Sequence, residues 1–374
     1  MTYIIKKNKK HLKVGSFMDS KLKIIAFNNC EKLAKDVSNE VEKHLDCKDI
    51  LVNIKNVRFT NGEGKMIIDD SVRNKDLYIM SDVGNYDCFY MLRNNKHHMS
   101  PDEHFQDIKR VVSATNGRYE KITLIMPFLY ESRQHRRKEG ESLDCAIALQ
   151  ELEELGIDDI ITFDCHDPNV SNAIPNLPFE NYYASDLILN NIKEKEQIDF
   201  DNVIIISPDF GAMERARYYA EIIGCDVGVF YKRRDLSKVV EGKNPIIDHV
   251  YLGQNPKGKD VIVVDDMIAS GGSMIDVATK LKKLGANKIV LVSTFGLFTE
   301  GTKTFDVKYK ENIFNKIYCT NLTYVPDEII NKEWFEIVDC SKLIAKIIIS
   351  HNLGIEYDFV DDEDINPELN IRVS

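Results

Sequence analysis

The segment VIVVDDMIASGGSM, residues 261–274, combines residue types that suit the binding of a phosphorylated sugar. Asp265 and Asp266 follow an aliphatic, β-branched run that is typical of a strand covered on both faces. Carboxylates at a strand end can accept hydrogen bonds from sugar hydroxyls or hold a metal ion. A helix is predicted over 274–284, so its start could bind a phosphate through the loop of small residues Ser270, Gly271, Gly272 and Ser273.

Polar residues follow three other strand-like runs in the same manner. Arg133 and Gln134 come after ITLIM (122–126), His166 comes after DIITF (159–163), and Asp209 comes after NVIIIS (202–207). In open parallel sheets, ligands bind beyond the carboxyl ends of the strands. We therefore expect these side chains to line one or two shared clefts.

The elements that must position these residues alternate between strands and helices. Strand-like runs occur at 23–27, 76–80, 122–126, 159–163, 202–207, 260–264 and 288–293. This alternation predicts parallel βαβ units in doubly wound sheets, and the number of units favours two tandem α/β domains. We expect domains at 1–166 and 167–345, followed by a C-terminal extension with an acidic tail at 346–374. Each domain should hold a mostly parallel sheet flanked by helices.

The composition is that of a soluble globular protein, with 43% hydrophobic and 29% charged residues in 374. No apolar run is long enough to span a bilayer, and the basic start has no apolar signal region, so no membrane or secretion function is predicted. Eight cysteines without a CxxC pair indicate reduced thiols in a cytoplasmic protein. The net charge of −11, concentrated in a tail that reads as solvated, argues against nucleic acid as a partner.

The segment 261–274 resembles the phosphoribosyl-pyrophosphate loop of type I phosphoribosyltransferases and of their relatives, the ribose-phosphate pyrophosphokinases. The resemblance implies two phosphoribosyltransferase-like domains. It also implies that Asp265 and Asp266 bind the ribose hydroxyls of ribose 5-phosphate. Residues 270–273 would then hold its phosphate.

Further motifs, in the order of the pyrophosphokinase family, extend this resemblance from about residue 23 to 345. They imply an adenine-binding hairpin that reaches across a subunit boundary, a triphosphate segment, metal contacts and a catalytic basic loop. The corresponding residues are Phe59, Asn61 and Glu63 for adenine, Arg133 and Gln134 for ATP, His166 for both the metal and the ATP phosphates, Asp209 for the metal, and Lys232 and Arg234 for catalysis.

The reaction implied by this resemblance transfers the β,γ-diphosphate of Mg-ATP to the C1 hydroxyl of ribose 5-phosphate. Its partners would be ATP, ribose 5-phosphate, Mg²⁺ and further copies of the chain, as dimers assembling to a hexamer. Two alternatives remain open. One is a catalytically silent regulatory subunit of such an enzyme, and the other is a base-specific phosphoribosyltransferase.

The chain departs from the family pattern at several positions. Asn61 stands where the family usually has Asp, His135 where an Asp commonly follows Arg-Gln, and Ala269 where pyrophosphokinases often have an acid. Residues 85–101 resemble an insertion.

Three other features are expected to have no role in the reaction. The segment 253–260 nearly matches a nucleotide-binding P-loop, but Asp260 replaces the required Ser or Thr and a strand follows the segment. His97 and His98 are expected at the surface, and Cys165 in the core.

Overall fold

The computed structural model describes residues 21–234 and 246–356. The basic start of the chain, the loop that follows Arg234 and nearly all of the acidic tail lie outside these residues. The expected solvated acidic tail therefore lies almost wholly outside the described residues.

The first sheet contains six parallel strands in the order β10-β9-β8-β5-β1-β2. Their bounds are β1 Leu22–Ala26, β2 Leu51–Val52, β5 Asp76–Met80, β8 Lys121–Ile125, β9 Asp159–Phe163 and β10 Phe179–Tyr182. The helices α2 (Pro101–Thr115) and α3 (Asp144–Glu154) cover one face, and α1 (Glu31–Leu45) covers the other. Strands between two helical layers must be apolar on both faces, and every residue of β9 is buried.

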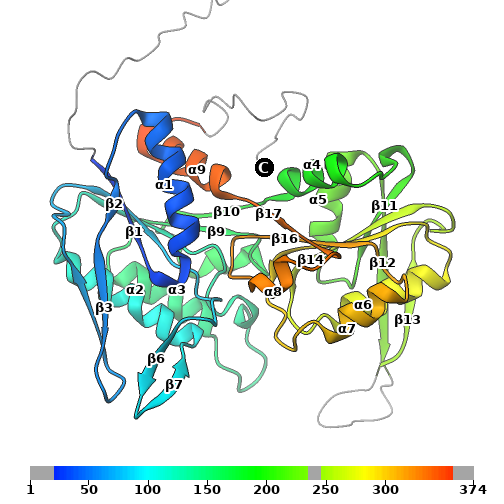
Figure 1. The fold of residues 1–374 in the computed structure, drawn as a ribbon, viewed down its shortest axis with the longest axis horizontal. Helices are drawn as coiled ribbons and strands as arrows, with labels where there is room; N and C mark the ends of the chain where they lie inside the picture. The colour runs from blue at the N-terminus through cyan, green and yellow to red at the C-terminus, as the bar shows by residue number, and fades with distance from the viewer. Residues whose placement is uncertain (1–20, 235–245, 357–374) are drawn as a thin grey trace, which may run out of the picture.

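The second sheet has the order β13-β12-β11-β14-β15-β16-β17, and β13 is its antiparallel strand. Its strands are β11 Val203–Ser207, β12 Asp226–Arg234, β13 Ile246–Leu252, β14 Asp260–Ile268, β15 Ile289–Gly296, β16 Lys316–Thr320 and β17 Phe335–Val338. On one face lie α4 (Ser185–Lys195) and α5 (Met213–Ile223), and on the other α6 (Gly272–Lys283), α7 (Lys303–Lys310) and α8 (Asp327–Ile330) (Figure 1). One apolar cluster contains side chains from both sheets, so the two sheets share a core.

The predicted fold class is confirmed, and each of the seven predicted strands is present. Two neighbouring strands run further than predicted: β14 continues through both aspartates to Ile268 instead of ending at residue 264, and β15 continues to Gly296 instead of ending at residue 293. Sheet membership also places β10 with the first sheet, although it follows the domain boundary that we expected after residue 166.

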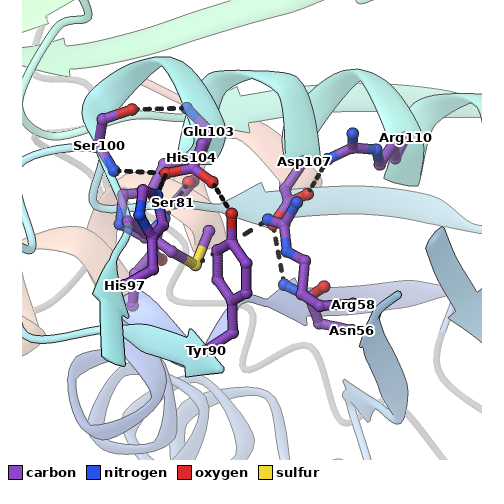
Figure 2. Close-up of polar contacts among 12 residues, drawn as sticks. Asn56, Arg58, Ser81, Tyr90, His97, Ser100, Glu103, His104, Asp107 and Arg110 are labelled. Carbon is purple, nitrogen blue, oxygen red and sulfur yellow. Dashed lines mark hydrogen bonds and ion pairs between the residues drawn. The ribbon is translucent and has the colours of Figure 1, made fainter. Parts of the chain in front are cut away.

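The insertion at 85–101 contains an antiparallel hairpin of β6 (Phe89–Leu92) and β7 (Asn95–His98). Figure 2 shows how it is fastened: the Tyr90 hydroxyl donates to Glu103 of α2 at 2.8 Å, and His97 Nε2 lies 3.1 Å from the same carboxylate. Glu103 and Ser100 also form a reciprocal capping box at the start of α2. The insertion is therefore part of the folded first domain.

The last described helix, α9 (Ser341–Leu353), leaves the second sheet and packs against α1 of the first domain (Figure 1). Its apolar residues join the cluster shared by both sheets. The chain thus crosses between the two domains twice within the described residues.

The described helices include none that is both long and apolar enough to cross a membrane. All eight cysteines are free thiols, as expected, and Cys165 is buried.

Candidate active site

A hydrogen bond between two of the predicted site residues, His166 and Asp266, joins the two domains. His166 follows β9 of the first sheet, and its Nδ1 lies 2.7 Å from Oδ2 of Asp266 on β14 of the second sheet. Asp266 is buried, whereas Asp265 beside it is partly exposed. We name this place the first junction: residues 164–166 of the first domain against Asp265 and Asp266 of the second.

A buried ion pair between Arg215 and Asp164 lies at the first junction. Arg215 of α5 donates through Nε to Asp164 Oδ1 at 2.7 Å, and its Nη1 lies 4.0 Å from Asp265 Oδ1. Thr294 Oγ1 donates to the other oxygen of Asp164. Asp164 adopts a φ of 41°, which is unusual for a non-glycine residue and turns the chain directly before His166.

The first junction and its immediate surroundings hold more carboxyl groups than cationic side chains: Asp164, Asp265 and Asp266 lie around Arg215. Burial and the charge of Asp266 together raise the pKa of Asp265 to about 8, although the charge of Arg215 lowers it. Although burial alone would raise the pKa of Asp266, its hydrogen bond with His166 and the charge of Arg215 hold it below the usual value. The same hydrogen bond raises the pKa of His166. Such a site suits a cation or a ligand rich in hydroxyl groups.

The predicted phosphate loop has the backbone that a phosphate needs. Gly271 has a φ of 78°, and a Cβ at this position would lie 2.0 Å from the ring of Phe305, so only glycine fits. Helix α6 begins at Gly272, and its N-cap, Gly271, provides no capping side chain. The N–H groups of this first turn therefore suit an anion.

Asp209 lies in the turn between β11 and α5. Its Oδ1 accepts from the backbone N–H of Gly211 at 2.9 Å, which shapes the turn that starts the helix carrying Arg215. Because β11 pairs with β14 in parallel, the turn after β11 lies at the same edge of the sheet as Asp265 and Asp266.

The predicted catalytic residues Lys232 and Arg234 lie at the end of β12, which pairs with β11. The structure describes their backbone, but their side chains lie outside its description. Register between β12 and β13 shifts between Arg233 and Arg234, so the strand becomes irregular at these residues.

The predicted triphosphate segment contacts the first junction through His135, which the sequence showed only as a departure from the family pattern. Arg133 and Gln134 form a short 3-10 helix, Ser132–Gln134. The next residue, His135, lies with its ring 5.3 Å from that of His166 and its Nε2 3.4 Å from Asp167. His135 therefore brings this basic segment beside His166.

The predicted adenine residues lie elsewhere. Phe59, Asn61 and Glu63 are at the turn of the hairpin formed by β3 (Ile54–Arg58) and β4 (Gly64–Ile68). Phe59 is 47% exposed, and Asn61 Nδ2 donates to Glu63 Oε2 at 2.9 Å. Figure 1 shows this hairpin projecting from the first domain, away from β14 of the same chain.

Sequence reasoning missed Asp164, Arg215 and Thr294 as residues of the site. Asp164 carried a signal, because it directly follows the buried strand β9, whereas Arg215 lies within α5. Nothing in the sequence pattern pointed to Thr294, which the structure brings to Asp164 from 130 positions away.

A second junction connects the domains at the carboxyl ends of other strands, β5 of the first sheet and β16 of the second. Asp82, which follows β5, accepts from the Thr323 hydroxyl at 3.0 Å and from the Tyr324 N–H at 2.7 Å. A cavity of about 1110 Å³ lies here, with Asn29, Tyr90 and Thr323 among its lining residues. None of the predicted site residues lines this cavity.

The three features set aside in the sequence stay apart from the first junction. The segment 253–260 joins β13 to β14 and so precedes a strand, as predicted. His97 and His98 lie on β7 with separate partners, Glu103 and the Tyr86 carbonyl. Burial raises the pKa of the Cys165 thiol, which marks it as a core residue.

Two tandem doubly wound domains with an acid-and-glycine loop at their junction define an enzyme of the phosphoribosyltransferase class. Residues 22–156 match the N-terminal domain of ribose phosphate pyrophosphokinase, and residues 180–321 match the phosphoribosyl transferase domain. The ribose-phosphate pyrophosphokinase of Helicobacter hepaticus is 30% identical over 69% of this chain and 75% of its own. The chain belongs to the ribose-phosphate pyrophosphokinase family.

Other similar proteins cover more of the chain. The ribose-phosphate pyrophosphokinase of Pyrococcus abyssi is 28% identical over 79% of this chain and 91% of its own. The crystal structure of phosphoribosylpyrophosphate synthetase from Mycobacterium smegmatis shares the fold with a TM-score of 0.72 at 20% identity, covering 89% of this chain and 99% of that one.

Proposed function

We propose that the chain transfers the β,γ-diphosphate of ATP to the C1 hydroxyl of ribose 5-phosphate, giving phosphoribosyl pyrophosphate and AMP. The observation that carries this proposal is the His166–Asp266 contact. It joins a segment of the first domain that we expect to bind ATP to the loop of the second domain that we expect to bind the sugar phosphate. A base-specific phosphoribosyltransferase would not need the first domain, which matches that of pyrophosphokinases.

The sugar phosphate is proposed to bind along β14 and the start of α6. Asp265 and Asp266 would accept hydrogen bonds from the ribose hydroxyls, and the N–H groups of residues 270–273 would bind the phosphate. The lowered pKa of Asp266 supports this role, because a charged carboxylate is the better acceptor. The fixed geometry of β14 would orient the C1 hydroxyl.

Mg²⁺ fits the same edge of the sheets. Mg²⁺ prefers oxygen ligands, so we propose that Asp209 and phosphate oxygens hold it, with His166 at the metal or at a phosphate. The acid excess at the first junction supports a cation there. When bound, the ion would neutralise charge on the triphosphate.

ATP is proposed to bind with its phosphates near Arg133, Gln134 and His166, while Lys232 and Arg234 stabilise the charge that develops as the diphosphate moves. The adenine residues on the β3–β4 hairpin project away from the first junction, which supports their use by a neighbouring copy in a homo-oligomer. The free thiols also support a cytoplasmic location.

The test incubates the purified protein with Mg-ATP and ribose 5-phosphate and resolves the nucleotide products. AMP is expected only when the sugar phosphate is present, in equal amount to phosphoribosyl pyrophosphate. Lys232→Ala should lower kcat at least about a hundredfold with ATP binding retained, whereas the exposed Lys96→Ala serves as the matched control. An absence of AMP from the wild-type protein under varied phosphate and metal would instead favour a silent regulatory subunit.

A further inference from the structure

Three side chains of metal-binding type converge at the amino edge of the first sheet. They are Asp159 at the start of β9, Glu180 on β10 and His351 near the end of α9, and one ligand atom from each lies within 4.8 Å of the others. His351 Nδ1 is 3.5 Å from Asp159 Oδ2, and its Nε2 is 3.2 Å from Glu180 Oε2. Because His166 follows the opposite end of β9, this cluster is separate from the first junction.

One oxygen of the buried Asp159 carboxyl group has no hydrogen-bond partner in the described part of the chain. Asp159 is 4% exposed, and its Oδ1 has no hydrogen-bond partner among the described residues. A buried oxygen without a partner is unfavourable, because it has lost its hydrogen bonds to water without replacing them. Oδ1 belongs to the same carboxyl group whose Oδ2 lies 3.5 Å from His351 Nδ1, so the unsatisfied oxygen is on one of the cluster's own ligand groups.

The charges around the cluster also favour a cation. Asp76, at the start of β5, accepts from Asn352 Nδ2 at 2.7 Å, which brings a third carboxylate to the end of α9. The Lys121 ammonium, 3.3 Å from Asp159, opposes these acids, and its side chain is 42% exposed. Burial would lower the pKa of His351, but its contacts with Asp159 and Glu180 raise it to about 9, so a bound ion would displace the imidazole proton. Three carboxylates and one ammonium then leave a charge of −2, which one divalent ion would balance.

We propose that Asp159, Glu180 and His351 bind a divalent transition-metal ion, such as zinc or cobalt, that fastens α9 to the first sheet. One imidazole and two carboxylates form a donor set that zinc accepts and that differs from the all-oxygen set preferred by Mg²⁺. The Tyr182 hydroxyl donates to Glu180, and Lys121 binds Asp159, so the outer contacts that orient metal ligands are present. Water would complete the coordination.

The test uses the full chain, stripped of metal with a chelator and then held in saturating Mg²⁺ to fill oxygen-type sites. Co²⁺ is titrated while its visible absorption and the heat of binding are recorded. One equivalent should bind to the wild-type protein. His351→Gln and Glu180→Gln should each weaken this binding at least about tenfold, whereas His98→Gln, on the exposed β7, should leave it unchanged.

Thermal unfolding separates a metal site from a simple ion pair. Co²⁺ should raise the Tm of the wild-type protein and of His98→Gln but not that of His351→Gln. Identical titrations for the wild type and both cluster variants, or no Co²⁺ binding at all, would show that His351 only bridges the two carboxylates as an imidazolium. If His351→Gln does not fold, Glu180→Gln decides the question, because the Glu180 side chain is 40% exposed.

Discussion

Two buried arginine–aspartate pairs in this protein have nearly the same geometry and different surroundings. Arg215 Nε lies 2.7 Å from Asp164, and Arg58 Nη2 lies 2.6 Å from Asp107. Both arginine side chains are 9% exposed, and the two aspartates are 2% and 1% exposed. Distance and burial alone therefore do not distinguish the Arg215–Asp164 pair, at the proposed active site, from the Arg58–Asp107 pair.

The neighbours make the distinction. Asp107 is also bound by Arg110 at 2.6 Å and by Asn56 at 2.8 Å, so its charge is satisfied within one domain (Figure 2). Around Arg215, in contrast, Asp265 and Asp266 add two further acids from β14, and His166 approaches from the other domain. Several acids and a histidine gathered from separate domains indicate chemistry, whereas an ion-pair network within one domain indicates structure.

Removing the carboxylate from each pair is the strongest test of this contrast. Asp164→Ala and Asp107→Ala should each lower the free energy of unfolding by about 3–5 kcal/mol, because each leaves a buried arginine without its partner. Chemical denaturation measures this loss. The folded fraction of Asp107→Ala should keep kcat within about threefold of the wild type, whereas Asp164→Ala should lose at least about a hundredfold. Equal kcat losses would remove the distinction between the pairs.

Two histidines sharpen the same contrast. His166→Ala should lower kcat at least about a hundredfold with a small change in Tm, because a partly exposed imidazole next to Asp266 would be lost from the site. His104, buried between Asn29 and the Asn85 carbonyl at the second junction, is the matched control. His104→Ala should lower Tm and keep kcat within about threefold. Steady-state kinetics together with thermal unfolding give both values, and a reversed pattern would contradict the assignment.

A pH dependence should come from the second junction. Burial raises the pKa of Asp82 to about 7, although hydrogen bonds from Tyr324, Thr323 and Gly84 lower it. The unfolded pKa is about 3.9, so between these values the folded state binds a proton that the unfolded state lacks. The contribution of Asp82 to stability should therefore fall as pH rises from about 4 to 7.

Urea unfolding of the wild type and Asp82→Asn across this range measures the effect. The variant should show a flatter dependence on pH, because an amide does not titrate. Parallel curves for the two proteins would mean that the Asp82 carboxyl group does not titrate in this range.

The smallest predicted effect concerns the inserted hairpin. Tyr90→Phe removes the hydroxyl that donates to Glu103, and Glu103 keeps its contacts with Ser100 and His97. The variant should lose about 1 kcal/mol of unfolding free energy without a change in kcat. A large loss of activity would mean that the second junction takes part in the reaction.

The parts of the fold that could be predicted are those that depend on the residue types within a short stretch of sequence. Buried β-branched runs identified the strands, and the glycine-rich turn indicated the start of the helix that begins at Gly272. The end of β14 was not predictable in this way. Asp265 pairs with Ser293 and Met267 with Phe295, so backbone pairing with a strand about 30 positions later extends the strand through polar residues.

The contacts between domains were also beyond the sequence pattern. His166 and Asp266 are 100 positions apart, and strand periodicity says nothing about which strand ends face one another across two sheets. Likewise, the helical spacing of 341–353 predicts no partner, and only the fold shows that α9 packs on α1.

Helix α1 is synthesised early but is packed by α9, which is synthesised near the end of the chain. The ribosome releases α1 first, but the surface that covers Leu33, Val37 and Val41 includes the last described helix. During synthesis, part of the apolar surface of α1 therefore stays exposed until α9 has been made. Any chain that stops before Ser341 keeps that face uncovered, so an incomplete product carries a mark that chaperones and proteases recognise.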